Sequence, residues 1–166
     1  MRNIAQIVTS VFIITLLGLS INVNAANNEG RLGVGTTNQL MTSLPAISFK
    51  IQKARAFSLG GLFGVNTDDD GGWGAGVKLY RILFDEPQLN FYGAILGALL
   101  NRKMGAGGED ESGFQFDLTL GCEFHFVGLS SLGFSFETGI SVNKLDDFVI
   151  ETVGQHFVTA AVHFYL

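Results

Sequence analysis

The sequence predicts an all-β fold: an eight-stranded antiparallel up-and-down transmembrane β-barrel, preceded by a cleaved signal peptide. Three observations lead to this prediction. The 166-residue chain starts with an apolar segment that ends at a small-residue motif, and the rest alternates apolar and polar residues with a period of two. Short connections also alternate with long ones along the chain. The length suits one domain.

Residues 1–25 are predicted to be the signal peptide. Arg2 supplies a positive charge, residues 4–21 form an apolar run, and Val23-Asn24-Ala25 fits the small-residue rule for signal peptidase. An uncleaved membrane anchor or a buried helix is the alternative. Residues 26–166 are then expected to form one outer-membrane β-barrel domain, because no later apolar run approaches the roughly 18–20 residues of a spanning helix.

The composition excludes some classes of function. Charged residues make up 15% of the chain and hydrophobic residues 47%, which is unusually apolar for a protein of this size. The net charge of −5 argues against a nucleic-acid partner. Cys122 is the single cysteine, so the fold has no intrachain disulfide.

Alternation of apolar and polar residues places eight strands along the chain. It is strictest over residues 113–126, where phenylalanine, leucine and cysteine hold one parity and polar residues or glycine hold the other. Strands are predicted at residues 30–38, 45–53, 56–66, 73–84, 89–101, 113–126, 132–143 and 158–166. Residues 89–101 are ambiguous because glycine and alanine occupy both parities, and here Tyr92, Leu96 and Leu100 are expected to face outward.

The connections predict the orientation of the barrel. The second, fourth and sixth links between strands are short, whereas the others are longer and the last two run to about a dozen residues. Outer-membrane barrels place short turns in the periplasm and long loops outside. An even number of strands then leaves both termini periplasmic.

The apolar parity is expected to face lipid. Eight strands enclose a lumen just wide enough for side chains to fill. The apolar parity carries most of the 15 phenylalanines, too much bulk for that lumen, whereas the glycine, serine and threonine of the other parity would fit. A soluble barrel with an apolar interior is the alternative.

The last strand carries a family resemblance. Residues 158–166 keep the alternation and place Phe164 close to the end. In this respect the chain resembles the small eight-stranded bacterial outer-membrane β-barrel proteins, of the porin-like superfamily, whose last strand ends in an aromatic residue. Leu166 departs from that pattern. The resemblance implies a Gram-negative envelope and recognition of Val162, Phe164 and Leu166 by the barrel-assembly machinery.

Several charged side chains fall on the inward parity. Buried charges persist when they are paired and hydrogen-bonded, so a luminal ionic network is expected. A gate or narrow ion path is the alternative. The network comprises Arg31, Lys50, Lys78, Asp117, Glu123 and Glu137.

Catalytic groups are sparse. His125, His156 and His163 invite the hypothesis of a lipid-modifying enzyme, which needs a nucleophile, a base and an orienting acid in contact. No serine is expected at the level of His125 or His163, so no catalytic residue is predicted. No cofactor or metal site is predicted either. Trp73 and Tyr92 are expected near the membrane interface, whereas Tyr165 and Phe84 are assigned to strand packing.

The sequence therefore favours a non-enzymatic outer-membrane barrel with a filled polar lumen, in a structural or loop-mediated binding role. A narrow channel for small solutes or ions is one alternative, and a lipid-modifying enzyme is the other. The expected partners are outer-membrane lipids. Lipopolysaccharide, bridged by divalent cations to acidic loops, is a further hypothesis. A monomer is expected.

Overall fold

The computed structural model describes residues 29–41, 44–54, 56–69, 71–103, 110–153 and 157–166. The predicted signal peptide lies outside the described residues. Within them, no helix has the length and apolar character that crossing a membrane would require.

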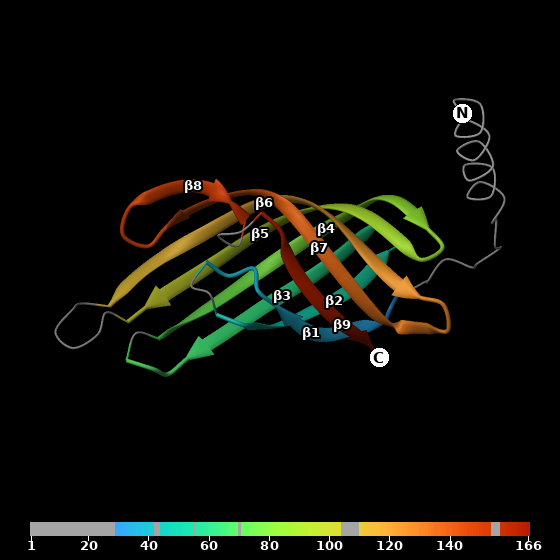
Figure 1. Cartoon of the computed structure of the whole chain (residues 1–166), viewed down its shortest axis with the longest axis horizontal. Coiled ribbons are helices and arrows are strands. Elements are labelled where there is room, and N and C mark those ends of the chain that lie inside the picture. The colour runs from blue at the N-terminus through green and yellow to red at the C-terminus, as the bar shows by residue number, and fades with distance from the viewer. Residues whose placement is uncertain (1–28, 42–43, 55, 70, 104–109, 154–156) are drawn as a thin grey trace, which may run out of the picture.

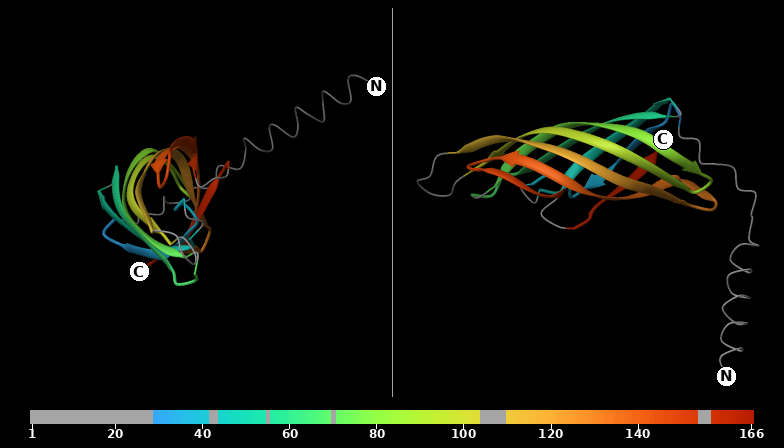
Figure 2. Two further views of the ribbon diagram at one scale, coloured as in Figure 1. Left: turned by 90° about the vertical axis from the view of Figure 1, so that its left-hand side faces the viewer. Right: turned by 90° about the horizontal axis from the view of Figure 1, so that it is seen from above.

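The described residues form one antiparallel sheet that closes on itself (Figure 1). Its strands are β1 (Leu32–Thr37), β2 (Ala46–Ala54), β3 (Phe57–Asn66), β4 (Gly72–Glu86), β5 (Leu89–Arg102), β6 (Glu111–Phe126), β7 (Leu129–Lys144), β8 (Phe148–Thr152) and β9 (Thr159–Tyr165). Consecutive strands from β1 to β7 pair with each other, and β9 pairs with both β7 and β1. The result is the predicted closed eight-stranded barrel, seen end-on in Figure 2 (left).

Two short strands share the eighth position of the barrel. Residues 132–137 of β7 pair with β9, and residues 140–144 pair with β8. The sequence predicts a loop of about a dozen residues here, and that prediction is wrong for β8. The reason is that Phe148, Val149 and Ile150 have the aromatic and β-branched side chains that favour strands, and they fold back on β7 after a three-residue turn.

The short turns gather at one end of the barrel, as the spacing predicts. Two residues separate β2 from β3, β4 from β5, and β6 from β7. In Figure 1 the last two turns lie at the right, close to the C-terminus, and the β3–β4 connection lies at the left. Gly128 adopts a φ of 78° in the β6–β7 turn, a conformation that glycine takes without steric cost.

The outer face of the barrel is apolar. Thirty-two large hydrophobic side chains are exposed in the described residues, most of them at alternate strand positions. On β6, Phe116, Leu118 and Leu120 point outward while Asp117 and Thr119 are buried in the lumen. An exposed apolar surface of this extent marks an interaction with another apolar phase or surface.

The facing of β5 is opposite to the prediction. Tyr92, Leu96 and Leu100 are at most 2% exposed and point into the lumen, whereas Ile95 and Leu99 point outward. Pairing with β6 fixes this parity, because Leu96 lies opposite the inward-facing Asp117. The alternation within residues 89–101 alone could not reveal this facing.

The aromatic side chains at the strand ends also depart in part from expectation. Tyr92 is buried in the lumen, so it is no interface anchor. Phe84 is 69% exposed and points outward, whereas packing within the strands was expected. Tyr165 is buried in the lumen, as packing would require, and Trp73 is exposed.

Tyrosine side chains fill the lumen where glycines make room for them. A Cβ atom added to any of three inward-facing glycines would lie 2.9 Å from a tyrosine ring carbon. The pairs are Gly33 with Tyr165, Gly60 with Tyr80, and Gly121 with Tyr92. Each glycine thus leaves the space that a tyrosine ring occupies inside the narrow barrel.

Candidate functional site: a charged lumen and its plug

The first ion pair in the lumen joins β2 to β6. Lys50 Nζ lies 2.7 Å from Glu123 Oε2, and both side chains are almost fully buried. The Tyr165 hydroxyl donates a hydrogen bond to the other carboxylate oxygen at 2.5 Å. Both oxygens of the buried carboxylate therefore have partners, the condition under which a buried charge is tolerated.

The second ion pair joins β4 to β7. Lys78 Nζ lies 2.6 Å and 2.5 Å from the two carboxylate oxygens of Glu137. The hydroxyls of Tyr92 and Thr119 each donate a hydrogen bond to this carboxylate at 2.9 Å. Three donors on β4, β5 and β6 thus converge on one buried acid of β7, and they tie these four strands together inside the barrel.

Tyr80 lies between the two lysines. Its ring centroid is 4.6 Å from Lys50 Nζ and 5.0 Å from Lys78 Nζ. The negative face of an aromatic ring attracts cations, so one ring reduces the repulsion between the two like charges. Tyr92 packs edge-on against Tyr80, with ring centroids 5.3 Å apart.

The β1–β2 connection folds into the barrel, and its described part lies in the lumen beyond these pairs, on the side remote from the short turns. We call the described part of this connection, residues 38–41 and 44–45, the plug. Gln39 bridges two wall residues, donating to Asp117 Oδ2 at 2.9 Å and accepting from Lys78 Nζ at 2.5 Å. Gln115 Nε2 donates to the Gln39 carbonyl at 3.1 Å, and its Oε1 accepts from the Met41 backbone N–H at 3.0 Å.

The plug carries apolar side chains into the half of the lumen remote from the short turns. Leu40 and Met41 are buried in one cluster with wall residues Leu62, Leu96 and Leu100. Glycines of β3 and β4 form a recess for these side chains: a Cβ atom at Gly74 would lie 2.9 Å from Leu40 Cδ1, and one at Gly64 would lie 3.2 Å from Leu44 Cβ. The wall is therefore shaped to the plug.

The plug was not predicted from the sequence, although two anomalies are related to it. Leu40, Met41 and Leu44 are apolar residues in a segment predicted to be a connecting loop. Leu62, Leu96 and Leu100 are leucines in the lumen, and the last two were predicted to face outward. Both anomalies have one explanation, because the two sets of residues pack against each other.

The six charged residues predicted to share the lumen occupy different levels. The four residues of the ion pairs lie across the barrel from one another. Asp117 connects to Lys78 through the Gln39 amide. Arg31 lies at the short-turn end, where it donates hydrogen bonds to the Ser131 hydroxyl and the Tyr165 carbonyl.

The three residues of the predicted C-terminal assembly signal, Val162, Phe164 and Leu166, are exposed on the outer face.

A serine–histidine pair lies in the lumen, contrary to expectation. Ser48 Oγ is 2.9 Å from His163 Nε2, across Gly35 of the intervening strand. Both side chains are at most 2% exposed, and His163 Nδ1 has no hydrogen-bond partner among the described residues. The pair therefore lacks the acid that orients the histidine of a catalytic triad. His156 lies outside the described residues.

Metal-binding groups do not cluster in the part of the chain that the structure describes, where no three histidine, cysteine or acidic side chains could hold one ion.

Neither a family model, nor a curated protein, nor a solved structure matches this chain. The class of protein that the fold and site define is an eight-stranded antiparallel barrel with a charged, internally plugged lumen.

Proposed function

We propose that this chain is exported through residues 1–25 and spans a bacterial outer membrane as a sealed, non-enzymatic barrel, with both termini periplasmic. The barrel would serve a structural role in the envelope or bind partners through its loops. The apolar outer face supports the membrane placement, because lipid is the phase that such a face requires. The short turns at one end and the longer connections at the other support the orientation.

The Gln39 bridge is the main observation that supports a sealed barrel. It fixes the plug to Asp117 on one wall and to Lys78 on another, and all three side chains are buried. Below the plug, the two ion pairs and three tyrosines fill the lumen. A lumen filled in this way leaves no aqueous channel.

Membrane fractionation with gel electrophoresis tests the placement. The protein is expected in the outer-membrane fraction, and an unboiled sample should migrate differently from a boiled one because the barrel stays folded in detergent. Recovery from a soluble fraction, with identical migration of the two samples, would refute the proposal.

Planar-bilayer recording tests the seal. The purified barrel is expected to show no stable unitary conductance. Reproducible unitary openings would favour the alternative of a narrow channel lined by the ion pairs.

A lipid-modifying enzyme remains the second candidate because of the contact between Ser48 and His163. Lipid analysis of cells that carry Ser48→Ala decides between the two. The composition is expected to match that of cells with the unmodified protein, and loss of one acylated lipid species would instead establish the enzyme.

A further inference from the structure

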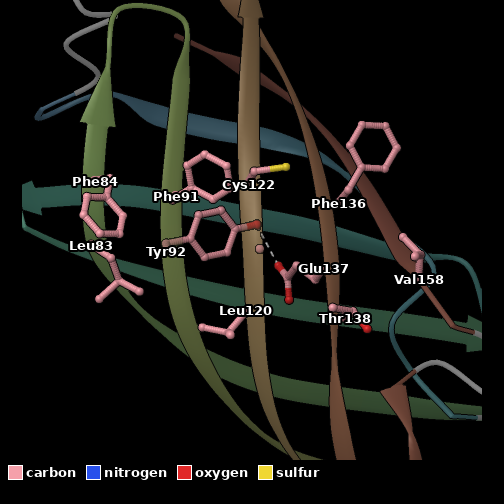
Figure 3. A pocket seen from close by; sticks show the side chains of 11 residues that line it. Leu83, Phe84, Phe91, Tyr92, Leu120, Cys122, Phe136, Glu137, Thr138 and Val158 are labelled. Carbon is pink, nitrogen blue, oxygen red and sulfur yellow. Dashed lines mark hydrogen bonds between the residues drawn. The ribbon is translucent and has the colours of Figure 1, made fainter.

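An apolar groove crosses the outer wall of the barrel from β4 to β7, near the short-turn end (Figure 3). Its volume is about 430 Å³, within the size range of small-molecule sites. Leu83, Phe91, Leu120, Cys122, Phe136 and Val158 contribute to its lining. The groove is open on its outer side, as expected of a site filled from the surrounding phase.

Small residues between large ones create the groove. On β6, Cys122 pairs with Phe91 on one side and with Phe136 on the other, so its short side chain lies between two rings. Along the next row, Gly93 pairs with Leu120 and places no side chain on the wall. The nearest atoms to a Cβ added at Gly93 would be 3.9 Å away, so the surface there is open.

A cation lies beside this groove on β4, outside its lining: Arg81 precedes Leu83 by two residues. Arg81 is exposed on the outer face of β4 and pairs with Gly93, the residue that separates it from Leu120. Its guanidinium carbon is 5.4 Å from the centroid of the Phe57 ring on β3, so in this structure the side chain extends over the strand on the other side of β4 from the groove. Phe57 is the first residue of β3 after the β2–β3 turn and pairs with Arg81, whereas β4 itself continues to Glu86 before its own short turn.

We propose that the groove holds an acyl chain of one glycerophospholipid from the leaflet at the short-turn end, and that Arg81 binds its phosphate. The planar guanidinium matches the geometry of phosphate oxygens, and the apolar groove matches a hydrocarbon chain. Gly93 places no side chain between Arg81 and Leu120, so the Arg81 side chain has room to turn from Phe57 toward the groove. The inference rests on the membrane placement proposed above.

A second hollow on the same face provides a matched control. It has a volume of about 510 Å³ and is lined in part by Ala75, Val77, Gly97 and Leu99. Among the described residues that line it, none carries a charge. It therefore offers apolar space without a partner for phosphate.

Native mass spectrometry of the protein purified from membranes tests the proposal with added phosphatidylglycerol and diacylglycerol as probes. The unmodified protein is expected to retain one phosphatidylglycerol. Cys122→Phe, which fills the groove, and Arg81→Gln, which removes the cation, should each weaken retention roughly tenfold. Ala75→Phe, which fills the control hollow, should leave retention unchanged, and diacylglycerol should bind equally to the unmodified protein and Arg81→Gln.

Equal lipid retention by the unmodified protein and Cys122→Phe would overturn the groove as the site. Equal binding of phosphatidylglycerol and diacylglycerol to the unmodified protein would overturn the role of Arg81. Each sample is also checked for heat-dependent migration, which reports the folded membrane barrel. A barrel that inserts but shows no selective retention refutes only this inference, whereas a protein that never enters membranes refutes the proposed function.

Discussion

The two halves of the lumen are filled in different ways. In the half near the short turns, side chains from the strands pair with each other across the barrel, as Lys50 does with Glu123 and Lys78 with Glu137. In the other half, the plug fills the space with Leu40 and Met41, which pack against leucines of the wall. Gln39 joins the two halves, because it contacts Lys78 below it and belongs to the plug above.

This difference shows that strand register and loop sequence determine the filling of different halves of the lumen. The charged half depends mainly on strand register, since a slip of one residue would turn each charge toward the outer face. The apolar half depends on a segment outside the sheet, and the wall provides glycines to receive it. Substitutions in the two halves should therefore fail by different physical routes.

The largest effect is expected from breaking an ion pair in the charged half. Lys50→Met leaves the buried Glu123 carboxylate without its cation, and should lower the free energy of unfolding by about 3–5 kcal/mol. The double variant Lys50→Met/Glu123→Gln removes both charges and should recover much of that loss. Urea titration of the barrel in lipid vesicles measures both, and a double variant as unstable as the single one would contradict the expectation.

Truncating the plug should have a somewhat smaller effect. Leu40→Ala creates a cavity in the apolar cluster and should cost about 2–5 kcal/mol. Leu118→Ala removes the same atoms from an exposed position on the outer face and opens no cavity in the lumen, so it serves as the control. The same titration should separate the two variants, and equal losses would show that the plug does not pack as described.

The next largest effect is expected from overfilling the recess that glycines of the wall form for the plug. Gly74→Ala places a Cβ atom 2.9 Å from both Leu40 Cδ1 and Leu100 Cδ2, and should destabilise the barrel by about 1–3 kcal/mol. Gly97→Ala is the matched control, because no atom lies within 4 Å of the Cβ position. Thermal unfolding of the two variants side by side tests the fit between plug and wall, which would be disproved by identical midpoints.

The smallest effect is expected at an ion pair outside the lumen. Arg102 and Glu111 lie 2.6 Å apart, with exposed fractions of 45% and 20%. Glu111→Gln should change the free energy of unfolding by less than about 1 kcal/mol, because water and salt screen the pair. A loss comparable to that of Lys50→Met would show that burial does not distinguish the pairs.

The parity of most strands could be predicted from the sequence, but that of β5 could not. Over residues 113–126, large apolar and polar residues separate cleanly, so the pattern alone gives the facing of each side chain. On β5, Ala94 and Ala98 face the lumen while Gly93 and Gly97 face outward, so small residues occur on both sides. The facing of Leu96 is decided by its partner on β6, which a local pattern does not contain.

Contacts between distant segments account for the rest. Ser48 and His163 are separated by 115 positions and meet because both pair with Gly35. The apolar residues of the plug are visible in the sequence, but their burial depends on glycines and leucines of three other strands. The charged residues were found because their inward parity is a local property, but their pairing is not.

The β1–β9 contact has a consequence for how the protein folds. It joins five residue pairs, against fourteen between β4 and β5, and brings together segments at opposite ends of the described chain. Closing so long a loop is entropically costly, so this pairing should form late. Asn38, the first residue of the plug, exchanges two hydrogen bonds with Ala160 of β9. Closure of the barrel and entry of the plug would then occur in one kinetic step. No long-lived intermediate with a closed barrel and an empty lumen should precede the native state.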